Sequence, residues 1–377
     1  MMNKFNFTKA KKIIIKLGSS IITNDGKGID EAFLSNFAAD ISLLAKKMQV
    51  VIVSSGAIAA GLKKLGISRR PSELSELQAA AAVGQMDLIR SFEKEFSKVS
   101  MICAQVLLTH DDLSDRKRYL NARSTLNNLL EKNVIPIINE NDTVSNEEIK
   151  FGDNDNLAAL TANLLEADYL ILLTDQDGLY SDDPRKNSNV TLLSHISVND
   201  KILDEVAKAT TSSVGRGGMY TKILAARRAS LSGTHTIIAN GKNRKVFSNL
   251  LNDSVSGTFI QSEERQLDAR KKWLAGQLKS KGTLIIDDGA TNAIVNSGKS
   301  LLSVGITDVK GKFDRGDLVQ CISSSGQEVA KGLINYSSSE VGKVLGQPSD
   351  KMESLLGYVN ESSVIHRNNL VVLKKGK

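Results

Sequence analysis

The sequence predicts an α/β protein in which a mostly parallel, open sheet is sandwiched by helices and is followed by a small β-rich barrel. Over roughly the first 260 residues, short β-branched runs alternate with segments of helical apolar spacing. Such alternation is typical of parallel sheets, because parallel strands are joined by long crossovers that are usually helices. From about residue 281 onward, turn signals separate short apolar runs instead, which indicates a β-rich barrel.

Composition narrows the class of protein. The 377 residues are 41% hydrophobic and 24% charged, which is ordinary for a globular protein and unlike a disordered one. The net charge of +7 suits an acidic partner such as a nucleotide or a small dicarboxylate, and it leaves RNA open. Cys103 and Cys321 lie far apart and are expected in the core, so neither a disulfide framework nor a zinc site is indicated. No signal core or membrane-length apolar run occurs, so a cytoplasmic location is expected.

The first expected strand is the apolar run 12–17, which ends in the small residues Gly18, Ser19 and Ser20. Backbone N–H groups in such a turn can face a phosphate. Lys16 lies within this run, where a lysine is costly unless its ammonium group reaches a partner or solvent. A lysine on an edge strand is the alternative interpretation.

A second expected strand, 50–53, follows a helix over 30–48 and leads through Ser54, Ser55 and Gly56 into a helix over 57–65. This strand-to-helix turn presents the positive end of a helix dipole. Ser55 can cap that helix, and it can also hold the carboxylate of a ligand.

The remaining elements continue the alternation. Helices are expected over 73–96, 114–132 and 223–231, and strands over 101–108, 168–173 and 236–239. The strand 168–173 ends in Thr174 and Asp175, and the glycine-rich loop 215–222 precedes the last helix with Lys222 just inside it. Paired glycines allow the backbone to approach a phosphate chain, so this loop indicates a phosphate site.

Two polar clusters flank one loop between residues 134 and 161. The strand-like run beginning at Val134 ends in Asn139, Glu140, Asn141 and Asp142, and residues 152–155 lead into an apolar helical pattern. Such side chains can cap and turn the chain, or they can hold a ligand where open α/β sheets usually bind one. The occurrence of both clusters favours a site, with Asp153 and Asn156 left as capping residues.

Domain boundaries follow the change in character. We expect an α/β domain over 1–260, a charged linker over 261–280 and a β-rich domain over 281–373.

The combined inventory suits phosphoryl transfer. Lysines at strand and loop ends, glycine-rich turns at helix starts and an Asp/Asn cluster supply what a moving phosphoryl group requires. None of the four histidines falls in these motifs. A carboxylate acceptor needs no general base because it is ionised at neutral pH, so the inventory fits a kinase that forms an acyl phosphate.

Several segments then resemble a known family, in order and with family-like spacing over nearly the whole chain. They are 16–20, 53–61, 82–85, 138–142, 151–156, 173–180 and 217–222, and they resemble the glutamate 5-kinases of the amino-acid-kinase family. Segments 287–290, 305–306, 313–317 and 357–358 of the tail resemble a PUA domain. The resemblance implies an amino-acid-kinase fold and the transfer of the γ-phosphoryl group of ATP to L-glutamate, the first step of proline biosynthesis.

The resemblance also implies roles for individual residues. Lys16 and Lys222 would neutralise the transferring phosphoryl group, and Asp155 would hold both lysines. Ser55, Asp142 and Asn154 would bind glutamate. Mg²⁺ is implied as cofactor, with no protein residue assigned to the metal. The residues implied for ATP are Lys16, Gly18, Ser19, Thr174, Asp175, Arg216, Gly217, Gly218, Met219, Tyr220, Thr221 and Lys222.

Further partners are implied by the same resemblance. They are proline as a feedback inhibitor, for which residues 114–123 are the segment to examine, glutamyl phosphate reductase as the next pathway enzyme, and further copies of the chain in a homo-oligomer. Arg216 replaces a small residue expected before Gly217, and Ser19 replaces a threonine, so the detail of the nucleotide loop departs from the pattern.

Two rival interpretations remain open. The chain could be another amino-acid kinase, acting on N-acetylglutamate, aspartate or a nucleotide, although Asp142 suits a free amino group better than an acetylated one. It could also be an RNA-binding protein, since PUA-like barrels often contact RNA, but the tail lacks an evident cluster of aromatic and arginine residues. We expect no RNA partner and a structural or regulatory tail.

Overall fold

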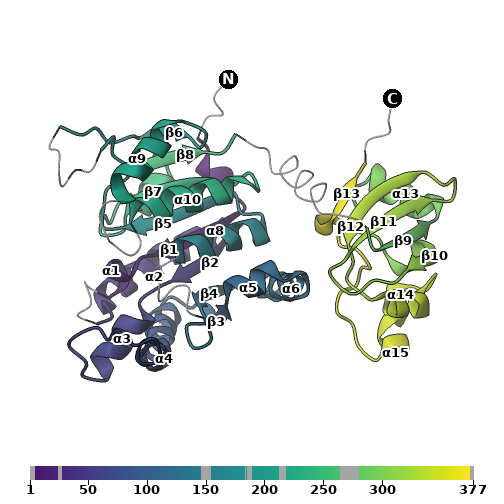
Figure 1. Cartoon of the computed structure of the whole chain (residues 1–377), viewed down its shortest axis with the longest axis horizontal. Coiled ribbons are helices and arrows are strands. Elements are labelled where there is room, and N and C mark those ends of the chain that lie inside the picture. The colour runs from purple at the N-terminus through teal and green to yellow at the C-terminus, as the bar shows by residue number, and fades with distance from the viewer. Residues whose placement is uncertain are drawn as a thin grey trace. The chain divides into compact units, whose positions relative to one another are not determined.

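The structure is a computed structural model that describes residues 5–23, 28–145, 154–182, 184, 189–211, 218–263 and 280–373. Two compact units are present, one containing an eight-stranded sheet and the other a five-stranded sheet within these described residues. Figure 1 shows the elements of each unit.

The eight-stranded sheet has the strand order β3-β4-β2-β1-β5-β7-β8-β6 in the described chain. The first six strands of this order, β3-β4-β2-β1-β5-β7, run parallel to one another. Strand β8 is antiparallel to β7, and β6 is parallel to β8. The predicted mostly parallel sheet is therefore confirmed. The strands are β1 (Lys12–Leu17), β2 (Gln49–Ser54), β3 (Ile102–Leu108), β4 (Val134–Glu140), β5 (Tyr169–Thr174), β6 (His195–Ser197), β7 (His235–Asn240) and β8 (Thr258–Gln261).

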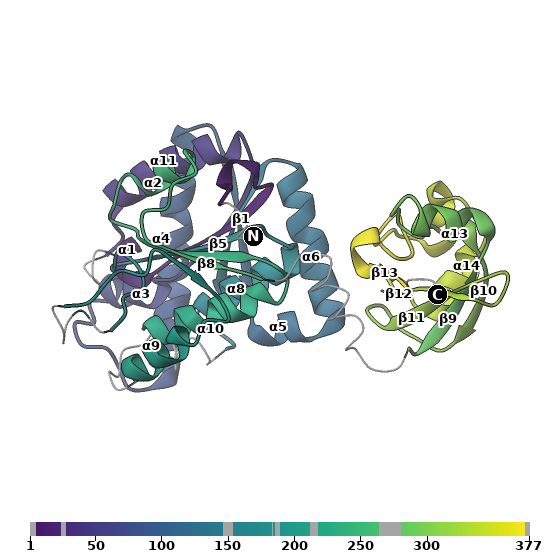
Figure 2. The ribbon, with the colours of Figure 1, turned by 90° about the horizontal axis from the view of Figure 1, so that it is seen from above.

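Helices cover both faces of this sheet, as Figure 2 shows, with α2 and α11 on one side and α8 and α10 on the other. Periodic apolar residues account for both layers, because each helix buries one stripe against the sheet. The helices are α1 (Ser19–Ile22), α2 (Glu31–Ala45), α3 (Ala57–Lys64), α4 (Leu74–Lys98), α5 (His110–Ser114), α6 (Arg116–Glu131), α8 (Asn154–Leu165), α9 (Ile202–Thr211), α10 (Met219–Ser230) and α11 (Val246–Leu250).

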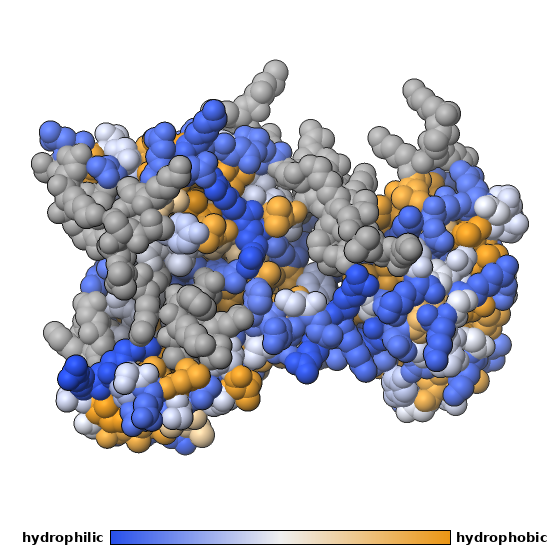
Figure 3. Space-filling view, in the orientation of Figure 1, coloured by the Kyte–Doolittle hydropathy of each residue, from blue (hydrophilic) through white to orange (hydrophobic). Residues whose placement is uncertain are grey.

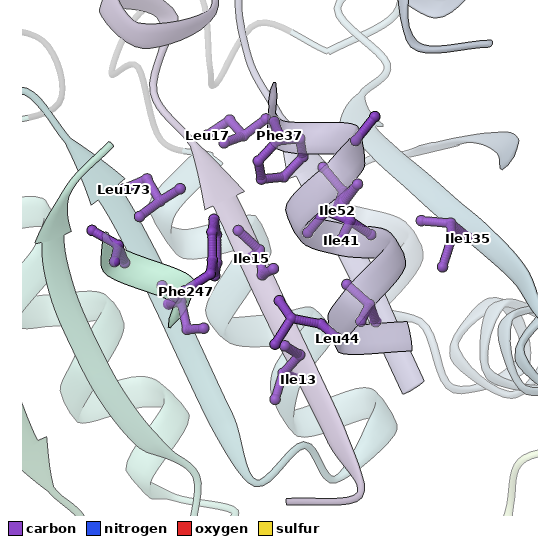
Figure 4. Close-up of a cluster of buried hydrophobic side chains, with 14 of the residues drawn as sticks. Ile13, Ile15, Leu17, Phe37, Ile41, Leu44, Ile52, Ile135, Leu173 and Phe247 are labelled. Atoms are coloured by element: carbon purple, nitrogen blue, oxygen red, sulfur yellow. The ribbon is translucent and has the colours of Figure 1, made fainter. Parts of the chain in front are cut away.

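One apolar core lies between the sheet and α2, α4 and α11. Alternate residues of β1 point into it, and Ile13, Ile15 and Leu17 are all fully buried. Figure 4 shows these side chains facing Phe37 of α2 and Phe247 of α11, whose ring centroids are 5.9 Å apart. The even-numbered positions of β1 therefore point to the opposite face, and this alternation turns Lys16 toward α8.

Helices α3 and α4 touch through their backbones. A Cβ atom on Gly61 of α3 would collide with the carbonyl oxygen of Ala80, and one on Gly84 of α4 would collide with that of Ala57. Only glycine allows this approach, so the two helices pack as a closely joined pair.

The second unit contains a sheet of order β10-β9-β11-β12-β13 among its described residues. It has its own apolar core, in which Phe313 and Tyr336 are buried. The apolar runs predicted as strands, 284–286, 318–322 and 371–373, lie in or overlap β9, β11 and β13, whereas β10, β12 and the helices were not predicted. The elements are β9 (Gly282–Ile286), α13 (Asp288–Val295), β10 (Ile306–Gly311), β11 (Leu318–Ser323), β12 (Glu328–Leu333), α14 (Ser338–Val344), α15 (Met352–Leu356) and β13 (Leu370–Val372).

The surface mixes polar and apolar residues over the face seen in Figure 3. Within the described residues, every helix is too short or too polar to cross a membrane.

Candidate active site

A buried carboxylate joins two lysines from distant parts of the chain. Lys16 Nζ of β1 lies 2.7 Å from Asp155 Oδ1, and Lys222 Nζ of α10 lies 3.0 Å from Asp155 Oδ2. The hydroxyl group of Thr221 also donates to Asp155 Oδ2, at 2.8 Å. The lysines are each 4% exposed and Asp155 is fully buried. Two positive charges and one negative charge therefore meet in one place, and the cluster carries a net positive charge.

The burial of these charges shapes their ionisation. Burial by itself would raise the pKa of the Asp155 carboxyl, but the charges of Lys16 and Lys222 outweigh it and hold the pKa well below its ordinary value. For Lys222, burial is the largest influence and lowers the pKa of the ammonium group, although the Asp155 charge opposes this. Asp155 is thus ionised at neutral pH and orders the two lysines.

A network of amide groups surrounds Ser55. Asn154, the first residue of α8, donates through Nδ2 to the Ser54 carbonyl oxygen at 2.8 Å and to Ser55 Oγ at 2.8 Å. The same nitrogen lies 2.9 Å from Asn139 Oδ1. Asn154 is fully buried and Asn139 is 1% exposed. The structure therefore brings the predicted residues Ser55 and Asn154 together.

Gly56 makes the turn that presents Ser55. Its φ angle is +99°, in the left-handed region, and a Cβ atom there would lie 2.8 Å from Thr23 Cγ2. Any other residue would be strained at this position. The turn leaves Ser55 immediately before the amino end of α3, where a helix dipole favours a negative charge.

Asp142 lies just beyond the end of β4 and is 5% exposed. Burial, followed by the neighbouring charge of Glu140, raises the pKa of the Asp142 carboxyl to about 7, and Arg70 opposes this rise. Its Oδ1 atom is buried without a hydrogen-bond partner among the described residues. A cation is the partner that such a carboxylate would favour.

Some of the residues implied for ATP lie where strands β5 and β1 end. Thr174, at the end of β5, donates from its hydroxyl group to Asp175 Oδ1 at 3.0 Å. The Gly18 N–H group already donates to the Leu173 carbonyl oxygen at 3.3 Å, while Ser19 begins α1 and is exposed.

The glycine-rich loop continues into α10. This helix begins at Met219, earlier than predicted, and places Lys222 in its first turn. Gly218 precedes it, Met219 is buried and Tyr220 is 40% exposed. Arg216, Gly217 and Asp153 lie outside the described residues.

Three contributing residues were not predicted as site residues. Asn139 accepts from Asn154, Gln85 Oε1 accepts from Asn139 Nδ2 at 2.8 Å, and Glu140 raises the pKa of Asp142. Asn139 and Glu140 belong to the polar cluster that ends β4, so their type and position already signalled a role. Gln85 ends the family-like segment 82–85, but its residue type indicated no role, because a glutamine on a helix is usually solvated.

Comparison with known proteins shows the family of this chain. Residues 11–240 match the model of the amino acid kinase family, and residues 282–356 match that of the PUA domain. A glutamate 5-kinase of Nitrosomonas eutropha is 51% identical over 374 residues, which are 99% of this chain and all of that protein. Those of Marinomonas sp. and Pseudomonas entomophila are 52% and 50% identical, over 97% of this chain and 98% and 99% of theirs. The chain therefore belongs to the amino acid kinase family and, within it, to the glutamate 5-kinase family.

Proposed function

We propose that this protein is a cytoplasmic enzyme that transfers the γ-phosphoryl group of ATP to the side-chain carboxylate of L-glutamate. The products would be γ-glutamyl phosphate and ADP, at the first step of proline biosynthesis. The observation that carries the proposal is the buried cluster of Lys16, Asp155 and Lys222, whose net positive charge would stabilise the phosphoryl group during its transfer. The names of relatives about half identical to this chain support the same reaction.

In the proposed reaction, a γ-carboxylate oxygen of glutamate forms a bond to the γ-phosphorus while the bond to the bridging oxygen of ADP breaks. No proton has to be removed, because the acceptor is already ionised. Lys16 and Lys222 would neutralise the charge on the phosphoryl oxygens, and Asp155 would hold both lysines in place. This division of labour relies on positioning and electrostatics, as phosphoryl transfer generally does.

The proposed roles in binding follow the charges. The Ser55 hydroxyl group and Asn154 would bind a carboxylate of glutamate, and Asp142 would bind its ammonium group. The turn at Gly18 and Ser19, the end of β5 at Thr174 and Asp175, and the loop 216–222 would hold ATP.

Magnesium would enter with the nucleotide. The described residues contain no cluster of three metal-ligating side chains, and the Asp155 carboxylate is taken by two lysines. Mg²⁺ commonly keeps several waters and binds through substrate phosphates and one or two carboxylates, so this chain fits it in that manner. Asp175 is exposed and close enough to Lys222 to influence its pKa, and it would hold magnesium-bound water. The ion would supply positive charge at the phosphates.

The reaction can be tested by trapping its product. With ATP, Mg²⁺, L-glutamate and hydroxylamine, we expect the purified protein to form γ-glutamyl hydroxamate, because hydroxylamine attacks acyl phosphates. N-acetylglutamate and aspartate serve as controls and should give little product. N-acetylglutamate lacks the free amine that Asp142 would bind, and aspartate is one carbon shorter than the proposed substrate. Absence of hydroxamate with glutamate, or a better rate with either control, would contradict the proposal.

We propose that RNA is not a partner of the second unit. Residues 281–373 contain nine basic and ten acidic side chains, so this segment lacks the positive charge on which RNA binding depends. Because the unit has its own core, a fragment over 281–373 can be purified and titrated with RNA at increasing salt. We expect no saturable binding at physiological ionic strength, and tight binding that weakens with salt would revive the rival function.

Other expectations remain proposals. We propose domain boundaries at 1–260, 261–280 and 281–373, proline as an inhibitor, a homo-oligomer, and glutamyl phosphate reductase as a partner. The boundaries can be tested by limited proteolysis, and inhibition by initial rates with added proline. Light scattering tests the homo-oligomer, and co-purification tests the reductase as a partner. A negative result in each removes that proposal.

A further inference from the structure

A line of hydrogen bonds runs from the middle of α4 to Ser55. Gln85 Oε1 accepts from Asn139 Nδ2 at 2.8 Å, and Asn139 Oδ1 accepts from Asn154 Nδ2 at 2.9 Å. Asn154 Nδ2 lies 2.8 Å from Ser55 Oγ. These residues come from α4, β4, α8 and the turn after β2, so the line crosses four separate segments.

The direction of each bond is set by backbone groups. The Glu140 N–H group, which can only donate, bonds to Asn139 Oδ1 at 3.0 Å. The Ser54 carbonyl oxygen, which can only accept, bonds to Asn154 Nδ2 at 2.8 Å. The Nδ2 atom of Asn139 therefore faces Gln85, and Gln85 accepts its hydrogen bond through Oε1.

This direction decides what Ser55 can do. An amide nitrogen cannot accept a hydrogen bond, so Ser55 Oγ does not donate to Asn154 Nδ2, whose two hydrogens are shared among Ser54 O, Ser55 Oγ and Asn139 Oδ1. The hydrogen of the Ser55 hydroxyl group is then left to be donated elsewhere. A carboxylate oxygen is a strong acceptor for it.

We propose that Gln85 is a positioning residue of the substrate site. By accepting from Asn139 Nδ2, it adds to the backbone groups of Glu140 and Ser54 in holding the amide line in place, so that the Ser55 hydroxyl group donates to a carboxylate of the bound amino acid. The inference rests on the proposed function and adds a residue that acts through Asn139 and Asn154. Its place on α4 suits the role, because the adjacent Gly84 fixes α4 against α3, which begins just after Ser55.

The test is Gln85→Met, which keeps the length of the side chain and removes the acceptor. Asn139 Nδ2 would then be a buried donor without a partner, and this cost would weaken the hold of Asn139 on Asn154. We expect KM for glutamate to rise about 5- to 50-fold, while kcat and KM for ATP change less than about twofold. Gln85→Glu, which restores an acceptor oxygen, should return KM to within about threefold of the wild type.

Matched controls separate positioning from a general structural effect. Gln78→Met makes the same change two turns earlier on α4, where Gln78 Nε2 lies 3.5 Å from the Ser145 carbonyl oxygen, and should change KM for glutamate less than about twofold. Ser55→Ala should cost less in the Gln85→Met background than in the wild type, because Gln85 acts through Ser55. If Gln85→Met does not fold, Gln85→Asn withdraws the acceptor by one methylene and should raise KM in the same direction.

The outcomes are distinct. A wild-type KM in the folded Gln85→Met or Gln85→Asn variant, an equal rise in KM for ATP, or additive effects with Ser55→Ala would overturn the inference. Hydroxamate formation by the wild type is measured first, so that failure of the proposed function is seen separately. An active wild type with an unaffected Gln85→Met variant removes only the role of Gln85.

Discussion

Replacing Asp155 with asparagine is expected to lower kcat by about 1,000-fold or more while the protein also loses stability. The change keeps the shape of the side chain but removes the negative charge between Lys16 and Lys222. The two ammonium groups would then repel each other in a buried place, and neither would be held toward the phosphoryl group. Initial rates of ADP release and a denaturant titration measure the two effects.

Two further variants make this prediction decisive. Lys222→Ala leaves Asp155 paired with Lys16, so it should fold and still lose about 100- to 1,000-fold in kcat. Asp168→Asn alters a carboxylate that accepts from the N–H groups of Lys11 and Lys12, at the opposite end of the sheet. It should lower stability and leave kcat nearly unchanged. A near-normal kcat for Asp155→Asn or Lys222→Ala would contradict the assigned roles.

Replacing Asp142 with asparagine is expected to raise KM for glutamate by about 100-fold and to stabilise the free protein at pH 8. The ammonium group of glutamate would lose its charged partner, which is worth roughly 2–5 kcal/mol in a buried pair. Without substrate, however, the ionised carboxylate lies buried beside Glu140, so its removal should raise the free energy of unfolding by about 1–3 kcal/mol.

The raised pKa of Asp142 gives this prediction a pH signature. The folded pKa of about 7 exceeds the ordinary value of 3.8, so the folded state binds more protons between these values. The contribution of this group to stability therefore falls as pH rises from about 4 to about 7, and Asp142→Asn removes that slope. In the wild type, kcat/KM for glutamate should decline below about pH 7 as Asp142 becomes protonated. A pH-independent kcat/KM between 6 and 8, or equal stabilities of both proteins at pH 8, would refute this account.

Much of the fold was predictable because local patterns determine it. The apolar runs of β1, β2 and β5 and their small-residue ends follow from burial on both faces of a parallel sheet. The helix predicted over 114–132 is present as α6, Arg116–Glu131, whereas the short helix α5 before it was missed. The signal lies in Thr109 and Asp112, whose mutual hydrogen bonds begin α5 earlier in the chain.

The strand order could not be predicted in the same way, since buried parallel strands resemble one another in sequence. It matters for the site, because β4 and β5 lie on opposite sides of β2 and β1. The helix α8 that joins them must cross over β1, and this crossing brings Asp155 to Lys16. The roles of Lys16 and Asp155 therefore came from family resemblance, while their distance required the structure. Gln85 was missed because its partner is a buried amide that only the folded chain places beside it.

The glycine contact between α3 and α4 has a consequence for the substrate site. Because the backbones touch at Gly61 and Gly84, a change that widens this contact would shift the Ser55 turn and Gln85 relative to each other. We expect the two helices to move as rigid bodies. A single methyl group introduced at Gly84 would therefore alter substrate selectivity without touching the substrate. The spacing of two helices is, in this sense, part of the recognition of one small acid.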